Sequence, residues 1–261
     1  MRATLTVLGS GTSMGVPTVG CDCEVCTSSD PHDRRTRPSI FLDFNDRGVL
    51  IDSGPDFREQ AIRERIRRVD AVLYTHAHAD HILGLDDLRP LSFAHKRNGS
   101  LLPLYADQHT ASVVARMFGY AFDPRSTYST RPQVELHPLP ERLELFGATF
   151  VSVPLAHGDS TVLGFRFGDA AYLTDFSDIP QSSLPLLEDL DILFLDALRR
   201  KPHPTHSSLD NSVRLVELIK PKRAFFTHMS HDLKHAETNA ALPEHIRLSH
   251  DGLKLHFEIT R

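Results

Sequence analysis

The feature that most constrains this sequence is a segment of seven residues, 75–81, which reads Thr-His-Ala-His-Ala-Asp-His. It places three histidines and one aspartate within six residues, directly after the apolar run 71–74. A short apolar run of this kind, partly β-branched and aromatic, predicts a buried strand. In α/β proteins, functional side chains gather on the loops that leave the carboxyl ends of strands. Four such donors indicate a metal site, and the alternative is a polar loop that is histidine-rich by chance in a chain with 16 histidines.

Further metal-binding side chains follow predicted strands elsewhere in the chain. His157 comes after the strands predicted in 143–153, Asp175 after a predicted hairpin, and His228 after the run 224–227. A single histidine of this kind would more often be a hydrogen-bonded interior residue. Four strand ends that bring donors to one edge form the arrangement that a binuclear metal site needs. The seven candidate ligands, enough for two ions if one carboxylate bridges them, are His76, His78, Asp80, His81, His157, Asp175 and His228.

A second group of candidate ligands lies near the start of the chain. Cys21, Cys23 and Cys26 are too close together for a disulfide framework. In a reducing compartment such a cluster is more often a metal site than a redox site. Three thiolates leave a tetrahedral zinc one ligand short, so the fourth ligand must come from elsewhere in the fold. Three free buried thiols are the alternative.

Length and composition fit a single globular domain that spans residues 1–261. A chain of 261 residues can bury an ample core, and its 24% charged and 40% hydrophobic residues are ordinary values. The net charge of −5 argues against a protein that coats nucleic acid or an anionic membrane. We find no apolar run of roughly 20 residues and no signal-peptide pattern, so we expect a cytoplasmic protein.

Apolar patterning predicts more strands than helices, with two sheets in the interior and helices outside. The glycine turn at 9–13 fits no phosphate-binding pattern, so we interpret it as tight packing beside the site. We expect a loop over 119–135. Strands are predicted at 4–8, 40–44, 48–52, 71–74, 103–105, 143–153 (two strands), 162–167, 170–174, 192–195, 224–227 and 253–259, and helices at 57–68, 83–91, 108–118 and 209–219.

Several of these motifs resemble those of the metallo-β-lactamase superfamily of hydrolases. The resemblance covers nearly the whole chain and implies an α/β fold, a four-layer αβ/βα sandwich of two mixed sheets flanked by helices, with two metals at one edge. It implies one metal on His76, His78 and His157, a second on Asp80, His81 and His228, and Asp175 as the bridge. Asp52 would orient a ligand from behind, in line with the general need for outer support. The matching segments are Leu50-Ile51-Asp52-Ser53-Gly54, His76-x-His78-x-Asp80-His81, His157, Asp175 and Thr227-His228.

The N-terminal part narrows the resemblance. Gly15-Val16-Pro17 followed by Gly20-Cys21-Asp22-Cys23-x-x-Cys26 is similar to the phosphoribosyl cyclic phosphate phosphodiesterase family of the carbon–phosphorus lyase pathway. That family carries a structural zinc on three such cysteines and a late histidine. The matching histidine in this sequence is His231, while His32 and His235 are rivals that chemistry alone leaves open.

The resemblance implies a metal-dependent phosphodiesterase that hydrolyses a small cyclic phosphodiester. A hydroxide that bridges two divalent ions is a strong nucleophile, and the ions can hold a phosphoryl oxygen. The departing alkoxide needs a proton, and His206 occupies the position of the family's proton donor. The alternatives are His203, or a solvent-facing role for His206 at the start of a helix. Asp80 is expected to help position water. These ligands suit Zn or Mn, and also Fe or Ni, and we expect one structural zinc in addition.

Three other functions are rivals. The tRNA 3′-end processing nuclease of the same superfamily carries a Gly/Pro-rich arm that has no counterpart here. The pyrroloquinoline quinone biosynthesis protein has a similar cysteine cluster, but the complete H-x-H-x-D-H motif favours a hydrolase. A non-catalytic metal-binding module is the third rival. We therefore expect a small phosphodiester as the ligand, neither membrane nor nucleic acid as a partner, and, from the family, a homodimer.

Overall fold

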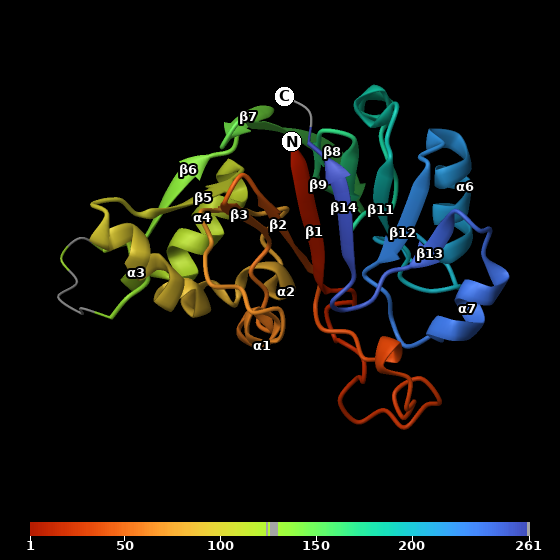
Figure 1. The fold of residues 1–261 in the computed structure, drawn as a ribbon. Coiled ribbons are helices and arrows are strands. Elements are labelled where there is room, and N and C mark those ends of the chain that lie inside the picture. The colour runs from red at the N-terminus through yellow and green to blue at the C-terminus, as the bar shows by residue number, and fades with distance from the viewer. Residues whose placement is uncertain (124, 126–129, 260–261) are drawn as a thin grey trace.

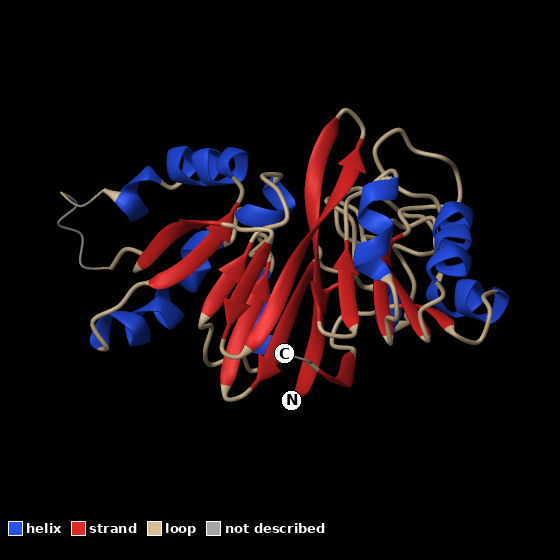
Figure 2. Ribbon diagram, turned by 90° about the horizontal axis from the view of Figure 1, so that it is seen from above, coloured by secondary structure: helices blue, strands red, loops and turns tan. Residues whose placement is uncertain are grey.

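A computed structural model describes residues 1–123, 125 and 130–259. Two seven-stranded sheets pack face to face, and helices cover the outer face of each (Figures 1 and 2). This arrangement confirms the predicted α/β sandwich of two mixed sheets flanked by helices. In the described part of the chain, no helix is long and apolar enough to cross a membrane.

The first sheet has the strand order β14-β1-β2-β3-β4-β5-β6. Neighbouring strands are antiparallel from β14 to β3 and parallel from β3 to β6. The fully buried side chains of Leu50, Tyr74, Leu104 and Val114 belong to the apolar layer between this sheet and its helices. The elements are β1 (Arg2–Gly9), β2 (Ser39–Phe44), β3 (Arg47–Ile51), α1 (Phe57–Arg63), β4 (Ala71–Leu73), α2 (Ala79–Ile82), α3 (Arg89–Arg97), β5 (Leu102–Ala106), α4 (Gln108–Met117), α5 (Gly119–Phe122), β6 (Val134–Pro138) and β14 (Lys254–Glu258).

The second sheet has the order β13-β12-β11-β10-β9-β8-β7 and is antiparallel from β7 to β10, then parallel to β13. Leu195, Val216 and Phe226 belong to the apolar cluster on its outer side, which includes side chains of α6. The elements are β7 (Arg142–Leu145), β8 (Ala148–His157), β9 (Ser160–Phe167), β10 (Ala170–Leu173), the 3₁₀ segment η3 (Gln181–Leu187), β11 (Ile192–Asp196), α6 (Leu209–Ile219), β12 (Arg223–Thr227), α7 (His235–Ala241) and β13 (Ile246–Leu248).

The main core lies between the two sheets. Every second residue of β1 points into it, and Leu5 meets a layer that includes Leu42, Phe150, Phe165 and Phe194, all nearly or completely buried. Each such side chain contributes about 1.5–3 kcal/mol when it leaves water. In β1 this period of two is the pattern that predicted the strand from the sequence.

The parallel strands determine where a site can form. β3 and β4 in one sheet, and β10, β11 and β12 in the other, end next to loops that carry polar side chains. Residues 10–38, between β1 and β2, form the red to orange loop that projects beyond the sheets in Figure 1. The glycine turn that starts this loop is tightly packed, because a Cβ on Gly9 would lie 1.9 Å from the carbonyl oxygen of Arg37.

The predicted helix at 209–219 is confirmed as α6, whereas two other predicted helices have the wrong bounds. The helix predicted at 57–68 ends at Arg63, because Arg65 adopts a left-handed backbone with φ of 56°. In place of the single helix predicted at 83–91, a 3₁₀ segment spans Leu85–Leu88, and α3 starts at Arg89 with Pro90 in its first turn, where proline is tolerated.

The predicted loop at 119–135 is also wrong over much of its described part, which contains α5 and the start of β6. Residues 124 and 126–129 of that loop lie outside the described residues. β6 ends in Pro138, and a strand with proline is compatible with this position because β6 forms the edge of its sheet. The short elements α7 and β13 were not predicted.

Candidate metal centre

The candidate ligands come from strand ends in both sheets. Three strand ends at the site, two with candidate ligands and one with Asp52, turn through left-handed backbone, with φ of 64° at Asp52, 56° at Asp175 and 58° at His228. Such values are uncommon outside glycine and are best tolerated by Asn, Asp and His. Each of these strands therefore ends at this turn, and the polar side chain at the turn lies against the neighbouring strand ends.

Close backbone packing positions the segment that carries Asp80 and His81. A Cβ on Gly54 would lie 2.1 Å from the carbonyl oxygen of Asp80, and one on Gly84 would lie 2.0 Å from the carbonyl oxygen of Gly54. Both positions therefore require glycine. Because the chain after β3 touches the backbone of α2 directly, the four-residue helix α2 has a fixed place beside Asp52.

The first group of donors consists of His76, His78, His157 and Asp175. Each offers one ligand atom, and these atoms all lie within 4.8 Å of one another. His76 Nε2 is 2.9 Å from His78 Nδ1 and 4.0 Å from Asp175 Oδ1. Three imidazoles and a carboxylate oxygen in this arrangement could hold one transition-metal ion.

The second group consists of Asp80, His81, Asp175 and His228, whose ligand atoms again lie within 4.8 Å of one another. His81 Nε2 is 3.1 Å from Asp175 Oδ2 and 3.3 Å from Asp80 Oδ2. His228 Nε2 is 3.1 Å from Asp175 Oδ1. Asp175 thus belongs to both groups, and the structure brings together all seven residues that the sequence proposed.

Unpartnered buried atoms indicate that a cation fits here. Four of the candidate ligands each have a buried side-chain atom without a hydrogen-bond partner among the described residues. Buried polar atoms are otherwise nearly always paired, so these atoms are suited to metal coordination. They are Asp80 Oδ2, His81 Nε2, His157 Nδ1 and His228 Nε2.

The charge of the centre leads to the same conclusion. Four buried carboxylates surround it, and their ion-pair partners in the described part of the chain are all histidines. Burial alone would raise the pKa of Asp175, but His228 and His81 hold it well below its usual range. Burial opposes ionisation of Asp80 too, and His81 and His228 again keep its pKa low. These low pKa values favour the ionised carboxylates that a metal site requires.

Asp52 supports His81 from the side opposite the metal centre. It is fully buried, and its Oδ2 lies 2.7 Å from His81 Nδ1. Thr75 donates to the same carboxylate from its backbone N–H and from its hydroxyl, both at 2.9 Å. A carboxylate in this place keeps the imidazole proton on Nδ1 and leaves Nε2 for a metal. The sequence suggested Asp52 but gave no sign of the role of Thr75.

We expect the Asp52→Asn substitution to weaken binding of the ion held by the second group about 10- to 100-fold, because His81 loses its charged support. No member of the first group contacts Asp52 directly, so the affinity of that group should fall less than the affinity of the second group. Calorimetric titration of metal-depleted protein measures both affinities. Asp46→Asn, on an exposed turn, is the matched control. Unchanged affinity at both sites would contradict this role.

His206 lies next to both donor groups. Its Nδ1 is 2.8 Å from Oδ2 of Asp196, which is fully buried. Its ring stacks on His228 with centroids 4.7 Å apart and meets the His157 ring edge-on at 4.9 Å. His203, the alternative from the sequence, lies one ring further out, 5.1 Å from His206. Asp196 was not predicted, although it follows an apolar strand as the other site residues do.

The three cysteines meet His231 on the neighbouring loop. Its Nδ1 lies 3.3 Å from the sulfurs of Cys21 and Cys26 and 3.6 Å from that of Cys23. In a tetrahedral site with Zn–S and Zn–N bonds of roughly 2.3 and 2.0 Å, sulfur and nitrogen ligands are about 3.5 Å apart. These four residues therefore fit one zinc ion.

The rival fourth ligands lie elsewhere. The rings of His32 and His235 stack on each other with centroids 4.7 Å apart, and neither belongs to the cysteine group. The buried side chain of Arg35 fixes the loop that carries His231, because its guanidinium donates to the carbonyl oxygen of Ser230 at 2.8 Å. Nothing in the sequence distinguished Arg35 from the other arginines.

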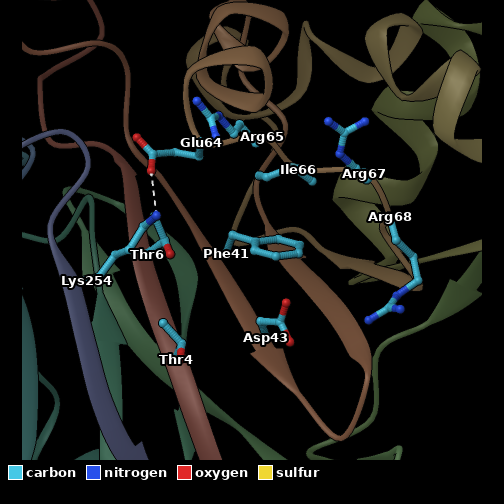
Figure 3. A pocket seen from close by; sticks show the side chains of 10 residues that line it. All are labelled: Thr4, Thr6, Phe41, Asp43, Glu64, Arg65, Ile66, Arg67, Arg68 and Lys254. Atoms are coloured by element: carbon cyan, nitrogen blue, oxygen red, sulfur yellow. Dashed lines mark ion pairs between the residues drawn. The ribbon is translucent and has the colours of Figure 1, made fainter.

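A separate surface cavity of about 350 Å³ contains none of the candidate ligands (Figure 3). Phe41 lies in it, and two of its cations are paired: Lys254 lies 3.2 Å from Glu64, and Arg68 lies 2.7 Å from Asp70. The cavity is therefore not part of the metal centre.

The chain is similar to proteins of known family and known structure. The family model described as "Beta-lactamase superfamily domain" matches residues 47–229. The solved structure of a diphosphatase from the PhnP family is 60% identical, with a TM-score of 0.94, and the alignment covers 99% of this chain and 98% of that one. Zn-bound PqqB from Methylobacterium extorquens shares the fold, with a TM-score of 0.75 at 20% identity over 97% of this chain and 99% of that one.

The curated relatives are described as different enzymes. An octanoyltransferase from Porphyromonas gingivalis is 38% identical over 254 residues, which are 95% of this chain and 50% of that protein. A ribonuclease Z from Bradyrhizobium diazoefficiens is 27% identical over 149 residues, 56% of this chain and 48% of that protein. The chain thus spans about half the length of these two relatives.

Proposed function

The chain belongs to the beta-lactamase superfamily, and from this membership and its metal centre we propose that it is a metal-dependent hydrolase that cleaves a phosphoric ester or anhydride bond in a small molecule. The observation that carries the proposal is Asp175, which is shared by two complete groups of donors. The 60% identical relative is described as a diphosphatase, which supports a diphosphate substrate. The cysteine motif supports a cyclic phosphodiester. In both kinds of substrate, water attacks a phosphorus atom that is joined to the rest of the molecule through two oxygen atoms.

The chain's own residues would divide the chemistry among them. The two groups of donors would hold two divalent ions, which when bound would lower the pKa of water and place positive charge near the phosphoryl oxygens. Asp80, which is ionised, accepts a hydrogen bond from the attacking water. His206 donates a proton to the departing oxygen, and Asp196 orients the ring through Nδ1.

Turnover measurements with a panel of substrates test the proposal. We expect hydrolysis of bis(p-nitrophenyl) phosphate, of a ribosyl cyclic phosphate or of a diphosphate diester such as ADP-ribose. Activity should disappear on chelation and return with Zn, Mn, Fe or Ni. Absence of turnover with every metal would contradict the proposal. Cleavage of precursor tRNA alone would instead favour the nuclease, and metal uptake without any turnover would favour a binding module.

The His206→Gln substitution should separate substrates by their leaving groups. We expect kcat to fall about 10²- to 10⁴-fold for a cyclic phosphate, whose alkoxide must be protonated as it leaves. The p-nitrophenolate of bis(p-nitrophenyl) phosphate leaves without a proton, so its kcat should change little. His109→Gln, at an exposed position on α4, is the control. An equal loss for both substrates would show that His206 is not the proton donor.

A further inference from the structure

The loop between β11 and α6 is strongly basic in a chain whose net charge is −5. No aspartate or glutamate lies between Asp196 and Asp210. The loop sits at the rim of the metal centre, since a Cβ on Gly158, directly after His157, would lie 2.9 Å from Thr205 Cγ2. Its basic and imidazole side chains are Arg199, Arg200, Lys201, His203 and His206.

His203 is held as a neutral hydrogen-bond donor. The backbone N–H of Thr205 lies 3.3 Å from His203 Nδ1. A backbone N–H can only donate, so Nδ1 is the acceptor and the ring proton is on Nε2. Burial, together with His206 and Arg199, lowers the pKa of His203 and favours this neutral form. Its ring lies next to His206, which itself stacks on the candidate ligand His228.

Arg199 offers a fixed positive charge near this ring. Its Nε and Nη2 donate to the carbonyl oxygens of Lys201 and Pro202 at 3.2 and 3.1 Å. Within the described residues it has no carboxylate partner, whereas Arg200 faces Glu237 at 4.0 Å. The planar guanidinium is well suited to phosphate oxygens because its donors match them in pairs.

We infer that His203 and Arg199 form an anion subsite beside the metal centre, which binds a second phosphoryl group of the substrate. The inference rests on the proposed function, because the first phosphoryl group is the one that is attacked at the metal centre. The second group is either adjacent, as in a diphosphate, or separate, as in a cyclic phosphate that carries another phosphate on its sugar.

The test compares substrates with and without the second group. One arm uses adenosine 2′,3′-cyclic phosphate and the same compound with a 5′-phosphate, and the other uses ADP-ribose against bis(p-nitrophenyl) phosphate. In His203→Asn and Arg199→Gln, we expect kcat/KM for the two-phosphate substrate of at least one arm to fall about 10- to 100-fold. Values for the one-phosphate substrates should stay within about twofold. Arg200→Gln removes the same charge from the adjacent position and should retain wild-type values.

The arm in which the loss occurs identifies whether the second phosphoryl group is adjacent or separate. Equal losses on one- and two-phosphate substrates, no loss in either arm, or an equal loss in Arg200→Gln would overturn the subsite. If the wild-type protein hydrolyses none of the probes, the proposed function fails. The subsite is then still tested by calorimetry, in which the substitutions must weaken binding of the 5′-phosphorylated compound and leave binding of its parent unchanged.

Discussion

Asp175→Asn is expected to lower kcat by about 10³-fold or more and to reduce the metal content at both sites. Asp175 is the one residue common to the two donor groups, so its loss should weaken the binding of both ions. Loss of about 4 kcal/mol of transition-state stabilisation, a modest part of what metal ions supply, corresponds to this factor. Asparagine tolerates the left-handed backbone at this position, where φ is 56°, so the fold should persist.

Elemental analysis of the purified protein and steady-state kinetics measure the two effects of Asp175→Asn together. Asp178→Asn makes the same chemical change at an exposed position three residues further along the chain and should behave as wild type. Full metal content with full activity in Asp175→Asn would contradict the shared carboxylate. Full metal content with low activity would place Asp175 in the chemistry but not in metal binding.

The double substitution Cys23→Ser, Cys26→Ser is expected to remove one zinc per chain and to lower Tm by about 10 °C. The cysteine loop and His231 lie more than 200 residues apart in sequence, and a zinc ion between them would tie the loop between β1 and β2 to the segment after β12. A structural zinc contributes directly to folding free energy. A loss of about 3–4 kcal/mol shifts Tm by about 10 °C in a chain of this size.

Zinc stoichiometry and thermal unfolding are the two measurements for this variant. His32→Gln is the matched control, because His32 was a rival for the fourth ligand but lies outside the cysteine group. It should retain the zinc and the wild-type Tm. Zinc retained at wild-type stoichiometry after the double cysteine substitution would contradict a structural zinc site at these residues.

The sequence allowed the fold and the candidate ligands to be predicted because both follow from local patterns. Alternating apolar residues marked strands such as β1 and β14, and a polar side chain after each apolar run marked His76, Asp175 and His228. The resemblance then divided these donors between two ions. The structure places the same residues together without any rearrangement of those groups.

The supporting residues could not be predicted because their roles depend on partners that are distant in sequence. Thr75 matters through Asp52, 23 residues earlier, and Arg35 matters through the carbonyl oxygen of Ser230, 195 residues later. Asp196 has an ordinary position after a strand, and only its 2.8 Å contact with His206 marks it. Backbone geometry was equally hidden, as the left-handed Arg65 that ends α1 shows.

The shared position of Asp175 has a thermodynamic consequence. Two ions that shared this carboxylate would not bind independently, so the centre would have a coupling free energy as well as two intrinsic affinities. Linkage makes this coupling reciprocal: the factor by which the first ion changes the affinity for the second equals the factor by which the second changes that for the first. At equilibrium, the composition of a mixed-metal centre would therefore depend on this coupling as well as on the free concentrations and intrinsic affinities of the two metals.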